Sequence, residues 1–397
     1  MLLRSLAKNK MLTGQRVLVR IDANVPIKNG KVVDGPYGKI AKSAVGLEWL
    51  MQRGARVIVM SHLGRPNGRR LMSCSLAPVA KRLGGLLHTR VPLSREIVGS
   101  SVEKRIAHMQ EGDILLLENI RFEAGEEQND PMFAKALARL ADLYVNDAFA
   151  VSHRAHASLE AIAKELPSFA GPLLKQEVNV LEQMSVHPRS PFIVCLGGKK
   201  IQTKLPLMQE LLPKADHFIF GGALAHPFLL AQGKTLGKSF IDQEEIPLAR
   251  QLLEQFGQKI ILPVDVVVCQ NLRGHSHFRE IPLEEIVSKD VIVDMGPKTM
   301  QIYSHCLKKA KTIIWNGPFG YCEIPAFCRG TIELARLIAA RTGKAKTLVG
   351  GGDTIPLVEA AGVADRFSLL STGGGAMLDF LTGQTLPGLE VLKKNHF

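Results

Sequence analysis

The sequence predicts an α/β fold of parallel sheets covered by helices, and three observations carry that prediction. Short apolar segments, often β-branched, recur along the chain; they end abruptly at Gly, Asp, Asn or Ser; and stretches long enough for helices separate them. Continuous apolar runs without period-two alternation are typical of strands buried on both faces. Their alternation with helices favours parallel sheets.

Eleven apolar runs are the expected strands. They cover residues 17–22, 57–61, 114–119, 143–147, 192–198, 218–222, 260–265, 291–296, 312–317, 347–352 and 367–375. Residues 130–141 and 331–341 are examples of the intervening expected helices. Because ligands bind beyond the carboxyl ends of parallel strands, the polar and glycine residues there are candidate site residues. For any single run, the alternative is that Gly or Asp merely ends the strand.

The length of 397 residues favours two domains, because a single core rarely grows beyond about 250 to 300 residues. A content of 46% hydrophobic and 22% charged residues excludes disordered, collagen-like and coiled-coil proteins. A boundary is expected near residues 165–190. There, a predicted helix over 173–184, with Leu174, Val178 and Leu181 on one face, lies between two proline-containing breaks.

The chain carries a formal net charge of +13, of which residues 1–165 contribute +9 and residues 166–397 contribute +4. Such an excess favours nucleic acid, an anionic membrane or a small anion as partner. The amino terminus lacks the apolar stretch of a signal peptide, and no run of about 18 apolar residues occurs. We therefore expect a soluble, cytoplasmic protein. Because most of the positive charge lies in residues 1–165, we expect this part, the first lobe, to be the main anion-binding part.

The six cysteines form no C-x-x-C pair. Their spacing indicates neither a disulfide framework nor a zinc site. Since their neighbours are mostly apolar, we expect reduced, packed thiols.

Arginines mark the ends of the expected strands in the first lobe. They are Arg20, Arg65, Arg121 and Arg154. Arginine suits bidentate recognition of phosphate or carboxylate, so a convergent set would bind a small polyanion. Asp22 and Asn24 could hold a hydroxyl group. Two alternatives stay open: each arginine could be a solvated surface charge, and His153 with His156 could suggest a metal, although no third ligand is evident.

Glycine clusters follow the expected strands of the second lobe. They are residues 197–198, 221–222, 317, 350–352 and 373–375. Glycine lets the backbone approach a phosphate, so the clusters predict a nucleotide site. The P-loop and dinucleotide fingerprints are absent, which disfavours those two classes. Asp353 is the candidate Mg²⁺ ligand, and the alternative is a helix cap formed by Asp353 or Thr354.

An arginine-lined lobe and a glycine-rich lobe joined by a helix predict phosphoryl transfer between a nucleotide and a small acid. This chemistry depends on positioning and charge neutralisation in a site that excludes water. A hinge between the lobes would both position the two substrates and exclude water from the site.

Eight motifs, in order along nearly the whole chain, resemble the phosphoglycerate kinase family. They cover residues 20–26, 61–66, 117–122, 146–158, 262–265, 315–318, 350–354 and 371–376. The resemblance implies an ATP:3-phosphoglycerate 1-phosphotransferase of glycolysis and gluconeogenesis that uses Mg²⁺ with ATP or ADP and bends at a hinge. It implies two Rossmann-like lobes with parallel sheets. Residues 1–167, with 379–397 packing back, would bind 3-phosphoglycerate, residues 168–187 would form the linking helix, and residues 188–378 would bind nucleotide.

The resemblance also implies a role for individual residues. Those expected to bind 3-phosphoglycerate or 1,3-bisphosphoglycerate are Asp22, Asn24, Lys39, His62, Arg65, Arg121, His153 and Arg154. Those expected to bind nucleotide are Gly198, Lys200, Lys204, Gly222, Asn316, Pro318, Glu323, Gly350, Gly351, Gly352, Asp353 and Thr354, with Asp353 holding the metal. Those expected to stabilise the transferring phosphoryl group are Lys39, Lys200, Gly373, Gly374 and Gly375.

The chain departs from the family pattern at several positions near the expected chemistry. Lys39 stands where the family has an arginine, Lys199 where it has alanine and Thr203 where it has aspartate. Residues 221–228 also lack the usual third glycine, methionine and threonine. Lysine keeps the charge of arginine but loses its planar fork.

These departures motivate an alternative function, a slow or inactive relative that binds nucleotide and an anionic partner. A nucleic-acid binder is disfavoured, because the sequence has no basic low-complexity tail or helix-turn-helix signature and only 6% aromatic residues. We expect a monomer without a membrane partner.

Overall fold

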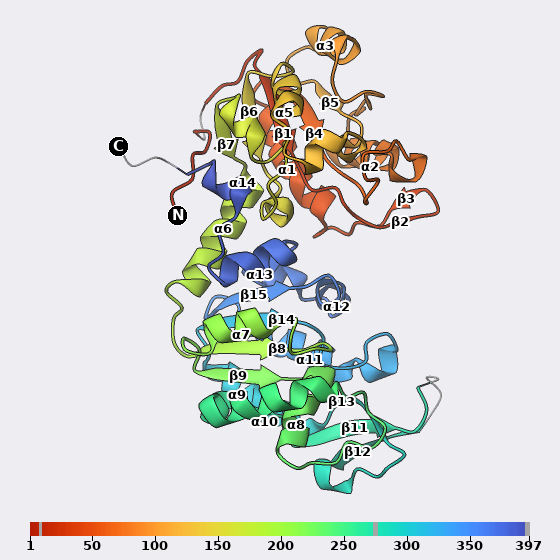
Figure 1. Cartoon of the computed structure of the whole chain (residues 1–397), viewed down its shortest axis with the longest axis vertical. Coiled ribbons are helices and arrows are strands. Elements are labelled where there is room, and N and C mark those ends of the chain that lie inside the picture. Colours follow the sequence, from red (N-terminus) through yellow and green to blue (C-terminus); the bar gives the residue numbers. More distant parts are fainter. Residues whose placement is uncertain (8–9, 273–276, 394–397) are drawn as a thin grey trace. The chain divides into compact units, whose positions relative to one another are not determined.

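The computed structural model describes residues 1–7, 10–272 and 277–393, and the chain forms two compact units (Figure 1). Unit 1 comprises Met1–Asn179 together with the segment from residue 384 onward, and unit 2 comprises Val180–Gly383. Within the described residues, no helix is both long enough and apolar enough to cross a bilayer.

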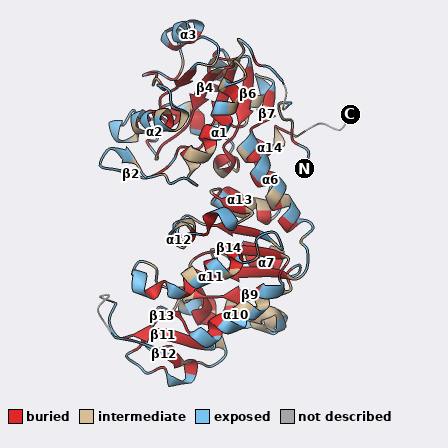
Figure 2. Cartoon of the chain, turned by 180° about the vertical axis from the view of Figure 1, so that it is seen from behind, coloured by how far each residue is buried: buried red, intermediate tan, exposed pale blue. Residues whose placement is uncertain are grey.

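Unit 1 is built on a parallel sheet with the order β5-β4-β1-β6-β7. Its strands are β1 (Arg16–Arg20), β4 (Arg56–Met60), β5 (Ile114–Leu116), β6 (Leu143–Asn146) and β7 (Ser168–Ala170). The strands are almost entirely buried (Figure 2), which explains their continuous apolar sequence.

Helices cover both faces of this sheet. They are α1 (Lys39–Met51), α2 (Ala77–Leu87), α3 (Ser100–Ala107), α4 (Ala124–Glu127) and α5 (Pro131–Ala138). Successive residues of β1 point to opposite faces: Val17 and Val19 pack in a core with α1 and α2, whereas Leu18 packs with α3 and α5. The sheet is therefore doubly wound, as the sequence predicts.

Short elements complete unit 1. They are β2 (Ile27–Lys28), β3 (Lys31–Val32), η1 (Met72–Cys74), η2 (Ile120–Phe122), η3 (Phe149–Val151), η4 (Ala161–Lys164) and α14 (Pro387–Glu390). The late segment joins the early chain through hydrogen bonds from Arg4 N to Leu392 O at 2.8 Å and from Gly388 N to Ser152 O at 2.9 Å. Residues 394–397 of the segment expected to pack back lie outside the described residues.

Helix α6 (Pro172–Ser185) begins in unit 1 and ends in unit 2. Leu174, Val178 and Leu181 are fully buried along it, as their spacing predicts. In the first turn of α6, Leu174 N donates a hydrogen bond to the Asp147 carboxylate at 2.9 Å. Burial raises the pKa of Asp147 to about 7.

The main sheet of unit 2 is also parallel, with the order β10-β9-β8-β14-β15-β16. Its strands are β8 (Phe192–Leu196), β9 (His217–Phe220), β10 (Ile260–Ile261), β14 (Thr312–Asn316), β15 (Lys346–Gly350) and β16 (Leu369–Ser371). Each begins within a residue or two of an expected strand, which confirms the parallel α/β prediction.

Helices alternate with the strands of unit 2. They are α7 (Leu205–Leu211), α8 (His226–Ala231), α9 (Ile246–Phe256), α10 (Pro297–Lys309), α11 (Arg329–Ala339), α12 (Ile355–Ala360) and α13 (Gly375–Leu381). Short 3-10 turns are η5 (Gly222–Ala225), η6 (Gln243–Glu245), η7 (Gly257–Lys259), η8 (Leu283–Glu285), η9 (Pro325–Phe327) and η10 (Ala364–Arg366).

A small antiparallel sheet of unit 2, with the order β12-β11-β13, differs from the sequence prediction. It contains β11 (Asp265–Cys269), β12 (Phe278–Pro282) and β13 (Val291–Met295). The expected strand over 260–265 is split, because Pro263 has no N–H to continue the parallel ladder and the chain pairs anew from Asp265. The run at 291–296 forms a strand, but an antiparallel one.

Candidate active site

In unit 1, a cluster forms where β1 ends and α1 begins. The Asp22 carboxylate accepts a hydrogen bond from Asn24 N at 2.9 Å and pairs with Lys39 Nζ at 2.6 Å. The Asn24 side-chain oxygen accepts a hydrogen bond from Gly64 N, in the loop after β4, at 3.0 Å. The structure therefore brings Asp22, Asn24 and Lys39 together, and Lys39 is the first residue of α1.

His62 lies within a ring of positive charge at the end of β4. Burial holds its pKa well below the usual range, and the charges of Arg20, Arg121, Lys39 and Arg154 lower it further. Arg20 Nη2 lies 3.0 Å from His62 Nδ1. A guanidinium can only donate, so Nδ1 accepts and the neutral ring carries its proton on Nε2. His62 is thus a neutral donor among cations that favour an anion.

Arg20 does not belong to the anion-binding surface that its position in the sequence predicted. Its side chain is fully buried, and it donates to Ser158 Oγ at 3.0 Å and to Ile21 O at 2.6 Å. The reason is its place as the last residue of a strand buried on both faces, where Glu126 lies close enough to favour its charge. Arg20 orients His62.

The remaining predicted residues of unit 1 differ in exposure. Arg121 is buried, donates to Gly64 O at 2.8 Å and pairs with Glu127 at 3.2 Å. Arg65 is exposed in the loop after β4.

His153 and His156 face different partners. His153 Nε2 lies 3.3 Å from Arg154 Nε, whereas His156 Nδ1 lies 3.6 Å from the buried Glu126 carboxylate. Among the described residues, no group of three His, Cys, Asp or Glu side chains could hold a metal ion. The metal alternative for this pair is therefore unsupported.

In unit 2, a cavity of about 340 Å³ lies at the carboxyl ends of β8, β14 and β15. Its lining consists of Gly197, Gly198, Lys199, Lys200, Thr203, Lys204, Asn316, Gly317, Pro318, Gly351, Asp353 and Thr354. Gly317 has a φ of +94°, and a Cβ there would lie 2.3 Å from Gly197 O. The loops approach so closely that only glycine fits. We call this space the smaller cavity.

Polar side chains converge on the smaller cavity. Lys204 Nζ donates to the Asn316 side-chain oxygen, and burial lowers its pKa while the nearby Asp353 charge raises it. Lys200 Nζ pairs with Asp242 at 3.2 Å. The buried Thr354 hydroxyl accepts a hydrogen bond from Gly317 N at 3.1 Å. The three lysines of this lining and the exposed carboxylate of Asp353 could take a phosphate chain and a cation.

A larger cavity of about 790 Å³ adjoins it. Its walls include the predicted residues Gly222, Pro318 and Glu323. They also include residues that sequence reasoning missed: Lys238, Phe240, Leu272, Tyr321, His226 and Asp294. Phe240 lies in a stretch with no expected strand or helix, so no periodic signal marked it. A mostly apolar cavity of this size, beside a smaller one lined by lysines and glycines, suits a nucleoside.

The predicted glycines of the second lobe are not all brought together. Gly351 lines the smaller cavity, but Gly350, Gly352 and Gly373–375 are absent from the described linings of both cavities. Gly373 N donates to Ser371 Oγ at 3.2 Å. Gly374 and Gly375 are exposed where α13 begins.

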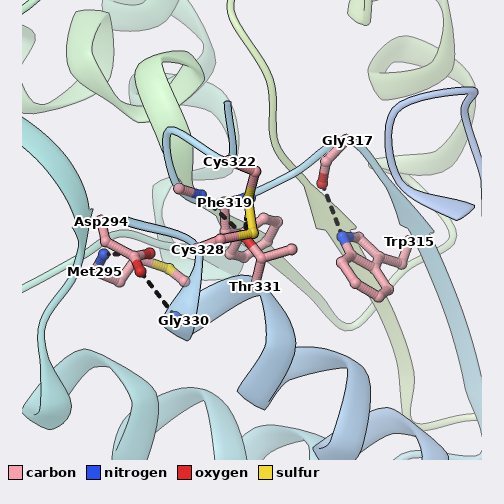
Figure 3. The surroundings of a disulfide bond; sticks show 10 residues. Asp294, Met295, Trp315, Gly317, Phe319, Cys322, Cys328, Gly330 and Thr331 are labelled. Atoms are coloured by element: carbon pink, nitrogen blue, oxygen red, sulfur yellow. Dashed lines mark hydrogen bonds between the residues drawn. A yellow bond between two sulfur atoms is a disulfide. The ribbon is translucent and has the colours of Figure 1, made fainter. Parts of the chain in front are cut away.

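A disulfide joins Cys322 and Cys328, contrary to the expectation of reduced thiols (Figure 3). The turn η9 between them brings their Cα atoms to 4.5 Å, a proximity that a search for C-x-x-C pairs does not detect. The other cysteines, all of them described, are free: Cys74, Cys195, Cys269 and Cys306. The bonded loop carries Glu323, a wall residue of the larger cavity.

Hydrogen bonds hold the segments that flank this loop on both sides (Figure 3). The Asp294 carboxylate accepts from Gly330 N at 2.8 Å, at the start of α11. The Thr331 hydroxyl accepts from Phe319 N and Gly320 N, each at 3.0 Å. The cavity wall is therefore tied to β13 and α11 as well as closed by the disulfide.

Comparison with known proteins gives a consistent result. The family model described as phosphoglycerate kinase matches residues 7–384. The curated "Phosphoglycerate kinase" of Moorella thermoacetica is 44% identical over 388 residues, which are 97% of this chain and 98% of that protein. The one of Desulfosudis oleivorans is 45% identical over 388 residues, which are 97% of each.

Solved structures agree with the curated relatives. Phosphoglycerate kinase from Coxiella burnetii has a TM-score of 0.86 and 38% sequence identity, covering 98% of both chains. The enzyme from Pyrococcus horikoshii has a TM-score of 0.85 and 31% identity, again covering 98% of both chains.

Proposed function

The chain belongs to the phosphoglycerate kinase family, and from that premise we propose that it transfers a phosphoryl group reversibly between 1,3-bisphosphoglycerate and ADP. The products are 3-phosphoglycerate and ATP, so the acceptor in the reverse direction is a carboxyl group. Unit 1 binds the phosphoglycerate and unit 2 binds the nucleotide. The enzyme works in the cytoplasm as a monomer in glycolysis and gluconeogenesis.

The charge around His62 supports phosphoglycerate binding by unit 1. Arg121, Arg154 and Lys39 are close enough to lower the pKa of the buried imidazole, so an anion placed there meets several cations at once. The neutral His62 ring offers its Nε2–H as a donor, and Asp22 with Asn24 holds a hydroxyl group. In this proposal, Arg65 and His153 are the remaining residues that bind the phosphoglycerate.

The two adjoining cavities of unit 2 support nucleotide binding. The larger cavity takes the nucleoside between Pro318, Gly222 and Glu323, and the smaller takes the phosphates beside Lys200, Lys204 and Thr354. The meeting of Lys204, Asn316 and Asp353 in the smaller cavity is the observation that carries the proposal.

Asp353 fits the role of Mg²⁺ ligand. It is an exposed carboxylate in the lining of both cavities, and Mg²⁺ in such sites takes one or two carboxylates, water and the substrate phosphates. When bound, the ion neutralises charge on the nucleotide phosphates.

In the forward reaction, an oxygen of the ADP β-phosphate attacks the acyl phosphorus of 1,3-bisphosphoglycerate. The bond from phosphorus to the carboxyl oxygen breaks, and the carboxylate leaves with its electron pair, so no covalent enzyme intermediate forms. Lys39 and Lys200 neutralise charge on the group in transit. Gly374 and Gly375, at the start of α13, present their amides to it, while the Gly373 amide donates to Ser371 Oγ and holds the turn that precedes them. Gly350, Gly351 and Gly352 shape the phosphate loop.

A coupled assay with 3-phosphoglycerate and MgATP tests the proposal. We expect turnover that depends on both substrates and falls when Asp353 is changed to Asn. The alternative is a relative that binds nucleotide without efficient turnover, motivated by Lys39 and Thr203. Turnover equal to that of buffer, with nucleotide still bound, would establish the alternative and overturn the proposal.

A further inference from the structure

The two cavities of unit 2 share a narrow set of wall residues. Among the described residues, Gly198, Lys199, Pro318 and Asp353 line both cavities, and we call these four the junction. A ligand that fills both cavities passes the junction. Its charged side chains are those of Lys199 and Asp353.

The side chain of Lys199 leans from the junction into the larger cavity. Its Nζ lies 4.2 Å from the centre of the Phe240 ring, which is itself a wall of that cavity. The Phe240 backbone is held in place, because His226 Nδ1 donates to Phe240 O at 2.7 Å. The ammonium group thus rests on an aromatic face at an exposed site, where such a contact is weak.

The neighbouring lysines point elsewhere. Lys200 Nζ pairs with Asp242 at 3.2 Å, and Lys204 Nζ donates to Asn316 inside the smaller cavity. The Thr203 hydroxyl donates to Lys200 O at 2.8 Å and adds no charge. Lys199 therefore supplies the positive charge of the junction.

We propose that Lys199 binds the phosphate group nearest the nucleoside, the α-phosphate of the nucleotide. This inference rests on the proposed nucleotide site and adds a residue to it. A nucleoside in the larger cavity with its terminal phosphates in the smaller one places the α-phosphate at the junction. There the Lys199 ammonium exchanges its contact with the Phe240 ring for a charge-assisted hydrogen bond to phosphate oxygen.

Binding of adenosine, AMP and ADP without metal tests the proposal by calorimetry or competition with a fluorescent nucleotide. The variants are Lys199→Met, which keeps the aliphatic stem, and Lys199→Ala, which removes it. The matched control is Lys344→Met, the same loss of charge at an exposed position of unit 2 outside both cavities.

We expect both Lys199 variants to raise the Kd of AMP and of ADP by roughly twofold to fivefold, the upper part of the range for an exposed ion pair. The Kd of adenosine stays unchanged, and the control variant alters none of the three. Added salt lowers the affinity of the wild type for AMP more than that of Lys199→Met, because the lost interaction is electrostatic.

Two results would overturn the inference while leaving the nucleotide site intact. One is an AMP affinity that is the same in wild type and Lys199→Met. The other is an equal weakening of adenosine and AMP, which would make Lys199 a wall residue without a phosphate contact. A wild type that binds neither AMP nor ADP would overturn the proposed function together with the inference.

Discussion

Removal of the Cys322–Cys328 disulfide is expected to lower the free energy of unfolding of unit 2 by about 2.4 kcal/mol at 25 °C. The magnitude follows from the loop that the bond closes, since the two cysteines are separated by 6 positions. In the folded state, hydrogen bonds to Asp294 and Thr331 hold the segments on both sides of the loop whether or not the disulfide is present. The main effect is therefore on the unfolded chain, which gains conformations when the link is cut.

Urea unfolding of the oxidised and dithiothreitol-reduced protein measures this difference, with the transition of unit 2 followed separately. A dithiol reduces the bond by exchange, forming two protein thiols and its own cyclic disulfide. Thiol titration in denaturant should count four free thiols before reduction and six after it. The double variant Cys322→Ala, Cys328→Ala is the control. Its free energy of unfolding should equal that of the reduced protein and should not change when dithiothreitol is added.

Two results would refute this reasoning. Six thiols in the untreated protein would mean that the bond does not form. Equal unfolding free energies with and without a proven bond would mean that the loop is already constrained in the unfolded chain.

Three further predictions concern single residues. Lys39→Arg should raise kcat in steady-state kinetics, because the rigid planar fork of arginine matches two phosphate oxygens better than the point charge of a lysine ammonium does. Gly317→Ala should weaken nucleotide binding and cost more than about 1 kcal/mol of stability in urea unfolding, because its Cβ would lie 2.3 Å from Gly197 O in addition to the unfavourable φ of +94°. Asp147→Asn should flatten the pH dependence of unfolding: the folded-state pKa of about 7 lies above the ordinary value of 3.8, so the wild type loses stability as pH rises from about 4 to 7.

Each of these predictions has a control. Lys28→Arg, at an exposed position of β2, should leave kcat unchanged. If Lys39→Arg also left kcat unchanged, Lys39 would not be the residue that contacts the transferring phosphoryl group. Gly343→Ala shares a positive φ of +75° but meets no atom within 4 Å, so an equal loss in both alanine variants would contradict the clash at Gly317. Parallel pH profiles for the wild type and Asp147→Asn would contradict the raised pKa of Asp147.

The sequence was sufficient to predict the parallel sheets, because strands buried on both faces must be apolar throughout. It did not reveal the antiparallel sheet of β11, β12 and β13. The outer strand β12 is largely exposed and lacks an apolar run, and a hydrophobic segment such as 291–295 carries no mark of its direction. Strand β7 was missed because it is short and follows Pro167.

For the candidate site, the sequence could predict which residues follow the strands but not which way their side chains turn. Arg20 and Arg121 look alike as arginines at strand ends and both are buried, yet Arg20 orients His62 whereas Arg121 donates to Gly64 O and pairs with Glu127. Phe240 reaches the larger cavity from a loop, and only the folded chain places it opposite Lys199. Pairing of Cys322 with Cys328 likewise depends on the turn between them.

The assignment of residues 384–393 to unit 1 has a consequence for protein synthesis. As the ribosome makes the chain from its amino terminus, residues 1–179 emerge long before the segment that completes their unit. All of unit 2 is made in between. Unit 1 therefore lacks its hydrogen bonds from Arg4 to Leu392 and from Asn146 to Gly388 until the last segment is made. By that time, unit 2 is already complete and can fold.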